Sequence, residues 1–152
     1  MKNKKIILLI FFILLNQCGY NSIYNNSSDL NIKIGILSMS GDREFNNKIF
    51  NQIRRFNKKE SSKEFNINLN TNINKDIVSK DTTGKVIDYV LKATATFKIT
   101  YNDINETITF EESLYIKNID DSFEQKKYED VIKDNFASSI YQKLIFKLKK
   151  IE

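Results

Sequence analysis

The chain has 152 residues with a formal net charge of +5, and it contains no histidine, no proline and one cysteine. Without histidine it lacks the commonest general base and metal ligand, and one cysteine forms neither a thiolate cluster nor an intramolecular disulfide. Lys2, Lys4 and Lys5 lie in a segment that we expect to be removed, which leaves 24 − 3 = 21 basic residues against 19 acidic ones. That balance is too weak for nucleic-acid binding, which needs a concentrated basic surface.

Residues 1–17 are typical of a secretory signal peptide. Residues 1–5 are basic, and residues 6–15 form a continuous apolar run. The run is too short for a membrane-spanning helix, which needs about 20 apolar residues. We therefore expect this segment to be cleaved after export.

The single cysteine, Cys18, stands directly after this segment. The sequence Leu15-Asn16-Gln17-Cys18 is similar to the lipobox of bacterial lipoproteins, in which the cysteine sulfur is lipidated, although Asn16 and Gln17 are atypical. A buried thiol or an intermolecular disulfide are the alternatives, but the polar stretch that follows argues against burial. We expect lipidation of Cys18, with residues 18–29 as a flexible tether, because several acyl chains hold a protein stably on a membrane. Gly19 follows Cys18, where an aspartate would favour retention in the inner membrane.

The next segment predicts a strand, a helix and a second strand. A short strand is expected over residues 30–38. Apolar residues four, four and three positions apart predict a helix over residues 42–59. Over residues 65–74, apolar residues or threonine alternate with asparagine, which predicts a strand with one core face and one amide face. That amide face meets either water or a hydrophilic partner, and the sequence favours water.

The second half predicts a hairpin and a long helix. Residues 85–101 and 104–117 are expected to pair across a turn at Asn102-Asp103. With Tyr101 opposite Ile104, apolar residues face each other throughout the hairpin, and a slip of one residue would oppose apolar to polar side chains. A helix is expected over residues 122–150, capped by Asp120 or Asp121. Its expected buried stripe is Tyr128, Val131, Ile132, Phe136, Ile140, Leu144 and Leu148.

Together these elements predict a two-layer α+β sandwich. The order is β-α-β-β-β-α, with both helices on one face of a four-stranded sheet and residues 30–152 as a single domain. No phosphate-binding loop, metal-ligand spacing or nucleophile elbow is present. Glu111 and Glu112 are neighbours on a strand and point to opposite faces, so they cannot form a catalytic pair. We therefore expect a non-enzymatic binding or structural protein without a cofactor.

With these features assembled, the chain resembles the LPS-assembly lipoprotein family, LptE. The residues that support the resemblance are Cys18-Gly19-Tyr20, the run over residues 91–97 and the terminal segment over residues 135–144. The resemblance covers essentially the whole mature chain. The proline often found after the Cys-Gly-aromatic start is absent.

The resemblance implies an outer-membrane lipoprotein, anchored on the periplasmic side. LptE proteins act as a plug in the LptD β-barrel, assist its assembly and bind lipopolysaccharide. Candidate contacts to the barrel or to lipopolysaccharide lie on the polar face of the hairpin, where lysine can pair with lipid phosphates. These candidates are Lys92, Thr94, Thr96 and Lys98.

Two alternatives come from other classes of protein. A subunit of a different envelope machine, or a lipid carrier, would share the anchor, and a carrier would need an internal apolar pocket. A carboxylate-dependent envelope hydrolase would need clustered acids in a cleft.

Overall fold

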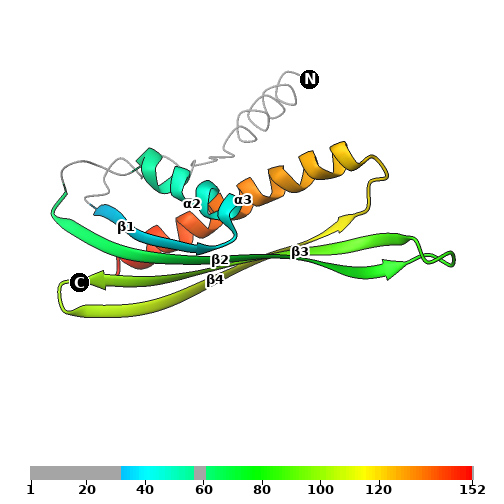
Figure 1. Cartoon of the computed structure of the whole chain (residues 1–152). Helices are drawn as coiled ribbons and strands as arrows, with labels where there is room; N and C mark the ends of the chain where they lie inside the picture. Colours follow the sequence, from blue (N-terminus) through cyan, green and yellow to red (C-terminus); the bar gives the residue numbers. More distant parts are fainter. Residues whose placement is uncertain (1–31, 57–60, 152) are drawn as a thin grey trace, which may run out of the picture. The chain divides into compact units, whose positions relative to one another are not determined.

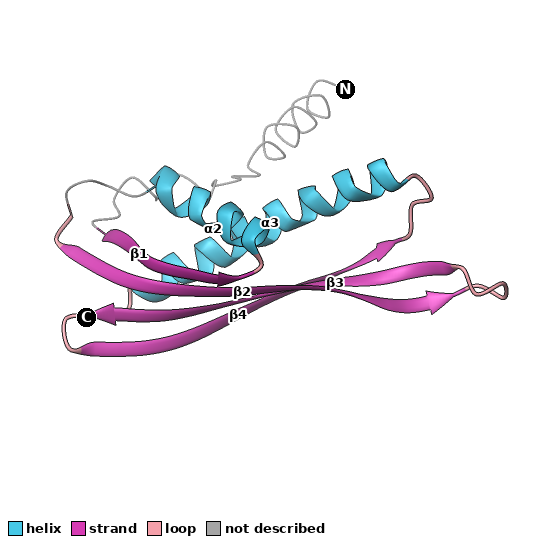
Figure 2. Cartoon of the chain, in the orientation of Figure 1, coloured by secondary structure: helices cyan, strands magenta, loops and turns pink. Residues whose placement is uncertain are grey.

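In the computed structural model, which describes residues 32–56 and 61–151, a four-stranded sheet supports two helices (Figure 1). The elements are β1 Ile32–Gly41, α2 Arg43–Phe56, β2 Lys63–Lys80, β3 Val86–Tyr101, β4 Ile104–Lys117 and α3 Ser122–Leu148. The strands keep this order across the sheet; β1 and β2 are parallel, and the other pairs are antiparallel. Figure 2 shows both helices on one side of the sheet, so the predicted α+β architecture is confirmed. The expected signal peptide, Cys18 and tether lie outside the described residues.

The core lies between the sheet and the helices. Alternate residues of β2, including Phe65 and Leu69, point toward the helices and are fully buried, as the sequence pattern predicts. Phe97 of β3 joins them from the neighbouring strand, and Phe45 of α2 and Leu144 of α3 close the layer from above. The described residues therefore have an apolar core of their own.

The hairpin has the predicted register. Tyr101 pairs with Ile104, and the matching continues along both strands to Tyr89 and Ile116. Asn102 takes the positive φ that the turn requires, at 49°, whereas Asp103 does not, so only the first turn residue behaves as expected.

The ends of two strands differ clearly from the sequence prediction. β1 runs on to Gly41 and contains a register shift between Ile36 and Ser38. β2 does not end at residue 74 but continues to Lys80, because β3 is long enough to pair with it there. α2 is described as far as Phe56, and the last predicted residues of this helix, 57–59, lie outside the described residues.

The expected buried stripe of α3 is wrong at its N-terminal end. Tyr128 and Val131 are 41% and 52% exposed, respectively. Gln125 is buried instead, and it lies seven residues before Ile132, on the same side of the helix. The remaining stripe, from Ile132 to Leu148, is buried as predicted. Asp121 caps the helix, since its side chain accepts hydrogen bonds from the backbone of residues 123 and 124.

Gly41 fixes the passage from β1 into α2. Its φ is 87°, and a β-carbon there would lie 1.8 Å from the carbonyl oxygen of Thr71. The next residue, Asp42, donates its backbone N–H to that same carbonyl at 2.9 Å. The Asp42 side chain then accepts from the backbone of Phe45 at 2.8 Å and begins the helix. The start of α2 is thereby held against the middle of β2.

Candidate functional site: the open face of the sheet

The face of the sheet that carries no helix is lined by polar side chains from all four strands. We call it the open face. The strand pairing aligns its residues in rows that cross the sheet, such as Ser40, Asn70, Thr96 and Thr109. Its members are Ser38, Ser40, Asn66, Asn68, Asn70, Asn72, Asn74, Lys92, Thr94, Thr96, Lys98, Thr100, Asn105, Thr107, Thr109, Glu111 and Ser113.

Side chains of the open face bond to one another across the strands. Ser38 donates its hydroxyl to the Asn68 amide oxygen at 2.6 Å, and Asn70 donates its amide to the Ser40 hydroxyl at 2.8 Å. The hydroxyls of Thr96 and Thr109 lie 3.0 Å apart. Thr100 donates to Asn105 at 2.9 Å. These lateral bonds leave a surface of amides and hydroxyls that still has donors and acceptors to offer.

All four predicted contact residues lie on this face, but their surroundings differ. Lys92 forms an ion pair with Asp76 at 3.0 Å, so its charge is already matched. Within the described part of the chain, no carboxylate lies within ion-pair distance of Lys98. Asp76 was missed because the predicted strand stopped at residue 74, two residues short of it. Lys98 is therefore the stronger candidate of the two lysines for an outside anion.

A shallow hollow of about 470 Å³ lies on the β1 side of the open face. Its lining is Ser38, Ser40, Asn68, Leu69, Asn70, Thr96 and Lys98. Serines from β1 were not among the predicted contacts, because the register shift at Leu37 that turns Ser38 and Ser40 to this face leaves no signal in the sequence. The hollow can hydrogen-bond a polar surface and offers one cation at its edge. Among the described residues, no group of His, Cys, Asp or Glu could hold a metal ion.

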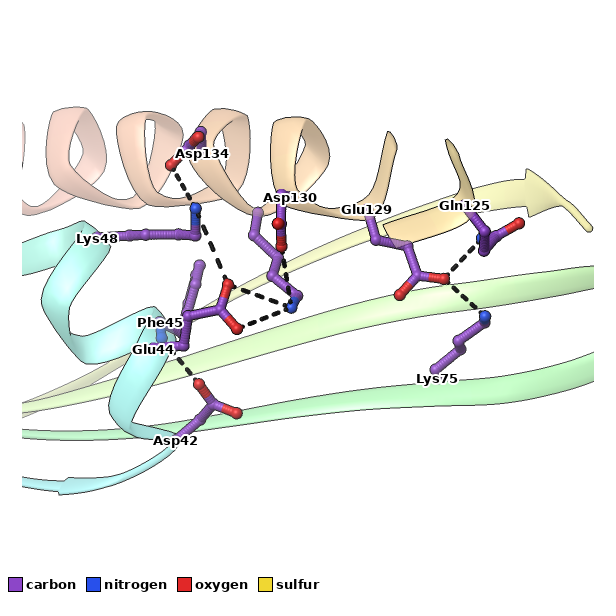
Figure 3. A network of polar contacts seen from close by, with 10 residues as sticks. Asp42, Glu44, Phe45, Lys48, Lys75, Gln125, Glu129, Asp130 and Asp134 are labelled. Carbon is purple, nitrogen blue, oxygen red and sulfur yellow. Dashed lines mark hydrogen bonds and ion pairs between the residues drawn. The ribbon is translucent and has the colours of Figure 1, made fainter. Parts of the chain in front are cut away.

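A second polar region lies between α3 and the part of the sheet around Lys75 and Tyr89 (Figure 3). Lys75 contacts Glu129 at 2.6 Å, and Gln125 donates to the same carboxylate at 2.6 Å while accepting from the backbone of Ile119. Lys75 also lies 3.9 Å from the centre of the Tyr89 ring. A hollow of about 650 Å³ adjoins this network. Because these charges pair with one another, the network serves to hold α3 on the sheet.

An ion pair at the edge of that hollow changes the pKa of one of its members. Lys85 donates to Asp120 at 2.7 Å. This hydrogen bond, followed by the charge of the carboxylate, raises the pKa of Lys85 above its ordinary value. Both side chains are exposed, so the pair closes the loop before α3 without creating a reactive amine.

Glu111 and Glu112 point to opposite faces, as predicted. Glu111 belongs to the open face, opposite Thr94. Glu112 faces α3, where it accepts from Ser139 at 2.6 Å and from Lys143 at 2.7 Å. Glu112 therefore ties β4 to the helix layer.

Comparison with known proteins finds similarity in structure only. No protein-family model and no curated protein matches the sequence. Rare lipoprotein B from Shewanella oneidensis aligns with a TM-score of 0.57 at 15% identity, over 77% of this chain and 98% of that one. An uncharacterized lipoprotein B from Nitrosomonas europaea aligns with a TM-score of 0.51 at 11% identity, over 79% and 88%. At such identities the comparison establishes a shared fold.

Neither α2 nor α3 combines the length and the apolar character that crossing a bilayer demands.

Proposed function

We propose that the chain is an outer-membrane lipoprotein, anchored through Cys18, that acts as plug and assembly partner of a β-barrel translocon delivering lipopolysaccharide to the cell surface. Two observations support this proposal. The sequence resembles the LptE family, and the fold is shared with rare lipoprotein B from Shewanella oneidensis. The barrel partner is LptD-like in this proposal.

The open face is the observation that supports a plug best. The lumen of a large outer-membrane barrel is polar. The polar groups of a protein that enters this lumen lose their hydrogen bonds to water. They must form hydrogen bonds with the barrel wall instead, because an unpaired buried polar group costs free energy. The side chains of the open face already bond sideways, for example from Asn70 to Ser40, and keep further donors for the wall. A polar face of this kind suits a broad polar contact.

The filled interior favours a plug over a lipid carrier. A carrier needs an apolar pocket, whereas the space between sheet and helices is occupied by fully buried side chains such as Phe45, Phe97 and Leu144. The two hollows described above have mainly polar linings. In this proposal lipopolysaccharide binds at the surface of the protein, where the Lys98 ammonium can pair with a lipid phosphate.

A depletion experiment tests the proposal. A strain depleted of the protein should contain less correctly assembled barrel and admit hydrophobic compounds, and the wild-type gene should restore both properties. The wild-type protein should also incorporate labelled palmitate. Cys18→Ser should take up no label and leave the membrane fraction, because it removes the acceptor sulfur while the folded unit is untouched.

Either of two results would contradict the proposal. Normal barrel assembly and normal lipopolysaccharide export after depletion would favour a different envelope machine. Wild-type protein that takes up no palmitate, or a precursor cleaved elsewhere, would contradict the anchor at Cys18.

A further inference from the structure

Several chain segments meet at one end of the folded unit. Ile32, where β1 begins, pairs with Lys63, where β2 begins. The Lys63 ammonium donates to the carbonyl oxygen of Ile151 at 3.1 Å, which places the end of the chain beside both strands. Figure 1 shows the ends of α2 and α3 at this same end. The expected tether enters the folded unit here, at Ile32.

This end carries basic side chains that have no acidic partner among the described residues. We call it the tether end and define it by Arg54, Arg55, Lys149 and Lys150, with Phe146. In the described ranges, no carboxylate lies within ion-pair distance of these four cations. Elsewhere the lysines that link elements, such as Lys48 and Lys75, are matched by carboxylates. Among the described residues, Lys126 and Lys127 at the other end of α3 have no ion pair either, so the four cations of the tether end are distinguished by lying where the chain enters.

An exposed aromatic residue accompanies this charge. Phe146 is 62% exposed, and the Lys150 ammonium lies 4.2 Å from the centre of its ring. Basic residues beside an exposed aromatic ring are the combination found on proteins that lie against a membrane surface. The first turns of α3 also carry lysines and an exposed aromatic residue, Phe123, but they contain Asp121 and Glu124 as well, whereas residues 145–151 contain no acidic residue.

We propose that the tether end docks on anionic phospholipid headgroups at the surface of the membrane that holds the anchor. The inference rests on the proposed lipidation of Cys18. The 14 Cα-to-Cα steps from Cys18 to Ile32 extend to at most about 50 Å, so the anchor keeps this end close to the bilayer. At such a high effective concentration, a few unmatched cations suffice, because each basic residue near an anionic surface adds to the attraction.

Vesicle binding of the non-lipidated mature chain tests the docking surface. The chain from residue 18 onward with Cys18→Ser keeps the whole described unit, which is compact by itself. Vesicles of phosphatidylglycerol with phosphatidylethanolamine should bind it at least tenfold more tightly than vesicles of phosphatidylcholine. High salt should remove the difference, because exposed charges are screened.

Matched variants on α3 locate the effect. Lys149→Glu with Lys150→Glu should weaken binding to the anionic vesicles at least tenfold, and Arg54→Glu with Arg55→Glu should do the same from α2. Lys126→Glu with Lys127→Glu makes the same charge change at the other end of α3 and should alter binding less than twofold. An unchanged melting temperature in each variant shows that the fold is kept.

The outcomes separate docking from anchoring. Equal binding to both vesicle types, or equal losses from the two ends of α3, overturns the docking surface. If Cys18 still takes up palmitate in cells, the proposed anchor stands without the docking surface. Absence of palmitate together with anionic selectivity overturns the anchor alone.

Discussion

Thr71 is a buried polar residue between β2 and α2. Its hydroxyl lies 3.0 Å from the Asn46 amide oxygen and 3.1 Å from the Asp42 carbonyl, and Asn46 in turn donates to the Ser40 carbonyl at 2.9 Å. The sequence pattern places Thr71 on the core side of its strand, but it gives no sign of the partner in the helix. The alternation of polarity specifies a face, whereas the hydrogen bond depends on how the helix lies on the sheet.

Thr71→Val keeps the shape of this side chain and removes its donor. The Asn46 oxygen then stays buried without that bond, so the free energy of unfolding should fall by about 1–3 kcal/mol in urea titrations. Thr107→Val, on the exposed open face, makes the same chemical change and should alter it by less than about 0.5 kcal/mol. Equal losses at both positions would show that the buried contact contributes nothing.

Tyr141 of α3 is buried, and burial raises the pKa of its phenol from 10 to about 12. The folded state therefore favours the neutral phenol, and this contribution to stability is complete below about pH 10 and is lost as the pH rises toward 12. Ultraviolet titration of wild type against Tyr141→Phe should show that the substitution removes one phenol that ionises near pH 12. Ionisation of that residue near pH 10 would contradict its burial.

At the scale of elements, α2 and α3 are joined by an exposed ionic cluster (Figure 3). Lys48 lies 2.9 Å from Asp134, and Lys133 lies 3.3 Å from Glu44. The two carboxylates are 60% and 52% exposed, so solvent screens both pairs. Apolar packing under the cluster, around Ile49, stabilises the helix pair more than these charges do.

A double-mutant cycle on Lys48→Ala and Asp134→Ala should give a coupling energy below about 1 kcal/mol, and high salt should reduce it further. Thermal or urea unfolding of the four proteins measures it. A coupling above about 2 kcal/mol that persists in salt would mean that the pair is shielded from water.

Elements with strict alternation could be predicted from the sequence, including the register of the β3–β4 hairpin. The distal part of β2 could not, because residues 75–80 do not alternate and are held in the strand by pairing with β3. At the start of α3, the sequence prediction wrongly placed the apolar residues Tyr128 and Val131 in the buried stripe. Gln125 is buried there because it bonds to Glu129 and the backbone of Ile119, contacts that depend on the tertiary structure.

At the scale of the whole molecule, the described unit presents two distinct surfaces. The open face is polar and hydrogen-bonded across the strands, and Lys98 is its unmatched cation. The tether end is basic and includes Phe146. The positions of Lys92, Thr94, Thr96 and Lys98 on one face followed from alternation along a single strand. That all four strands contribute to one polar surface could not be predicted in this way, because it depends on the order of the strands in the sheet.

Purification of tagged protein from solubilised outer membrane tests the central claim most directly. Wild-type protein should elute with one large β-barrel protein in equal amounts. Lys92→Glu with Lys98→Glu should lower recovery of that barrel at least tenfold, whereas Lys126→Glu with Lys127→Glu on α3 should not. Elution of the wild-type protein without any barrel would contradict the account, and so would equal recovery with the open-face variant.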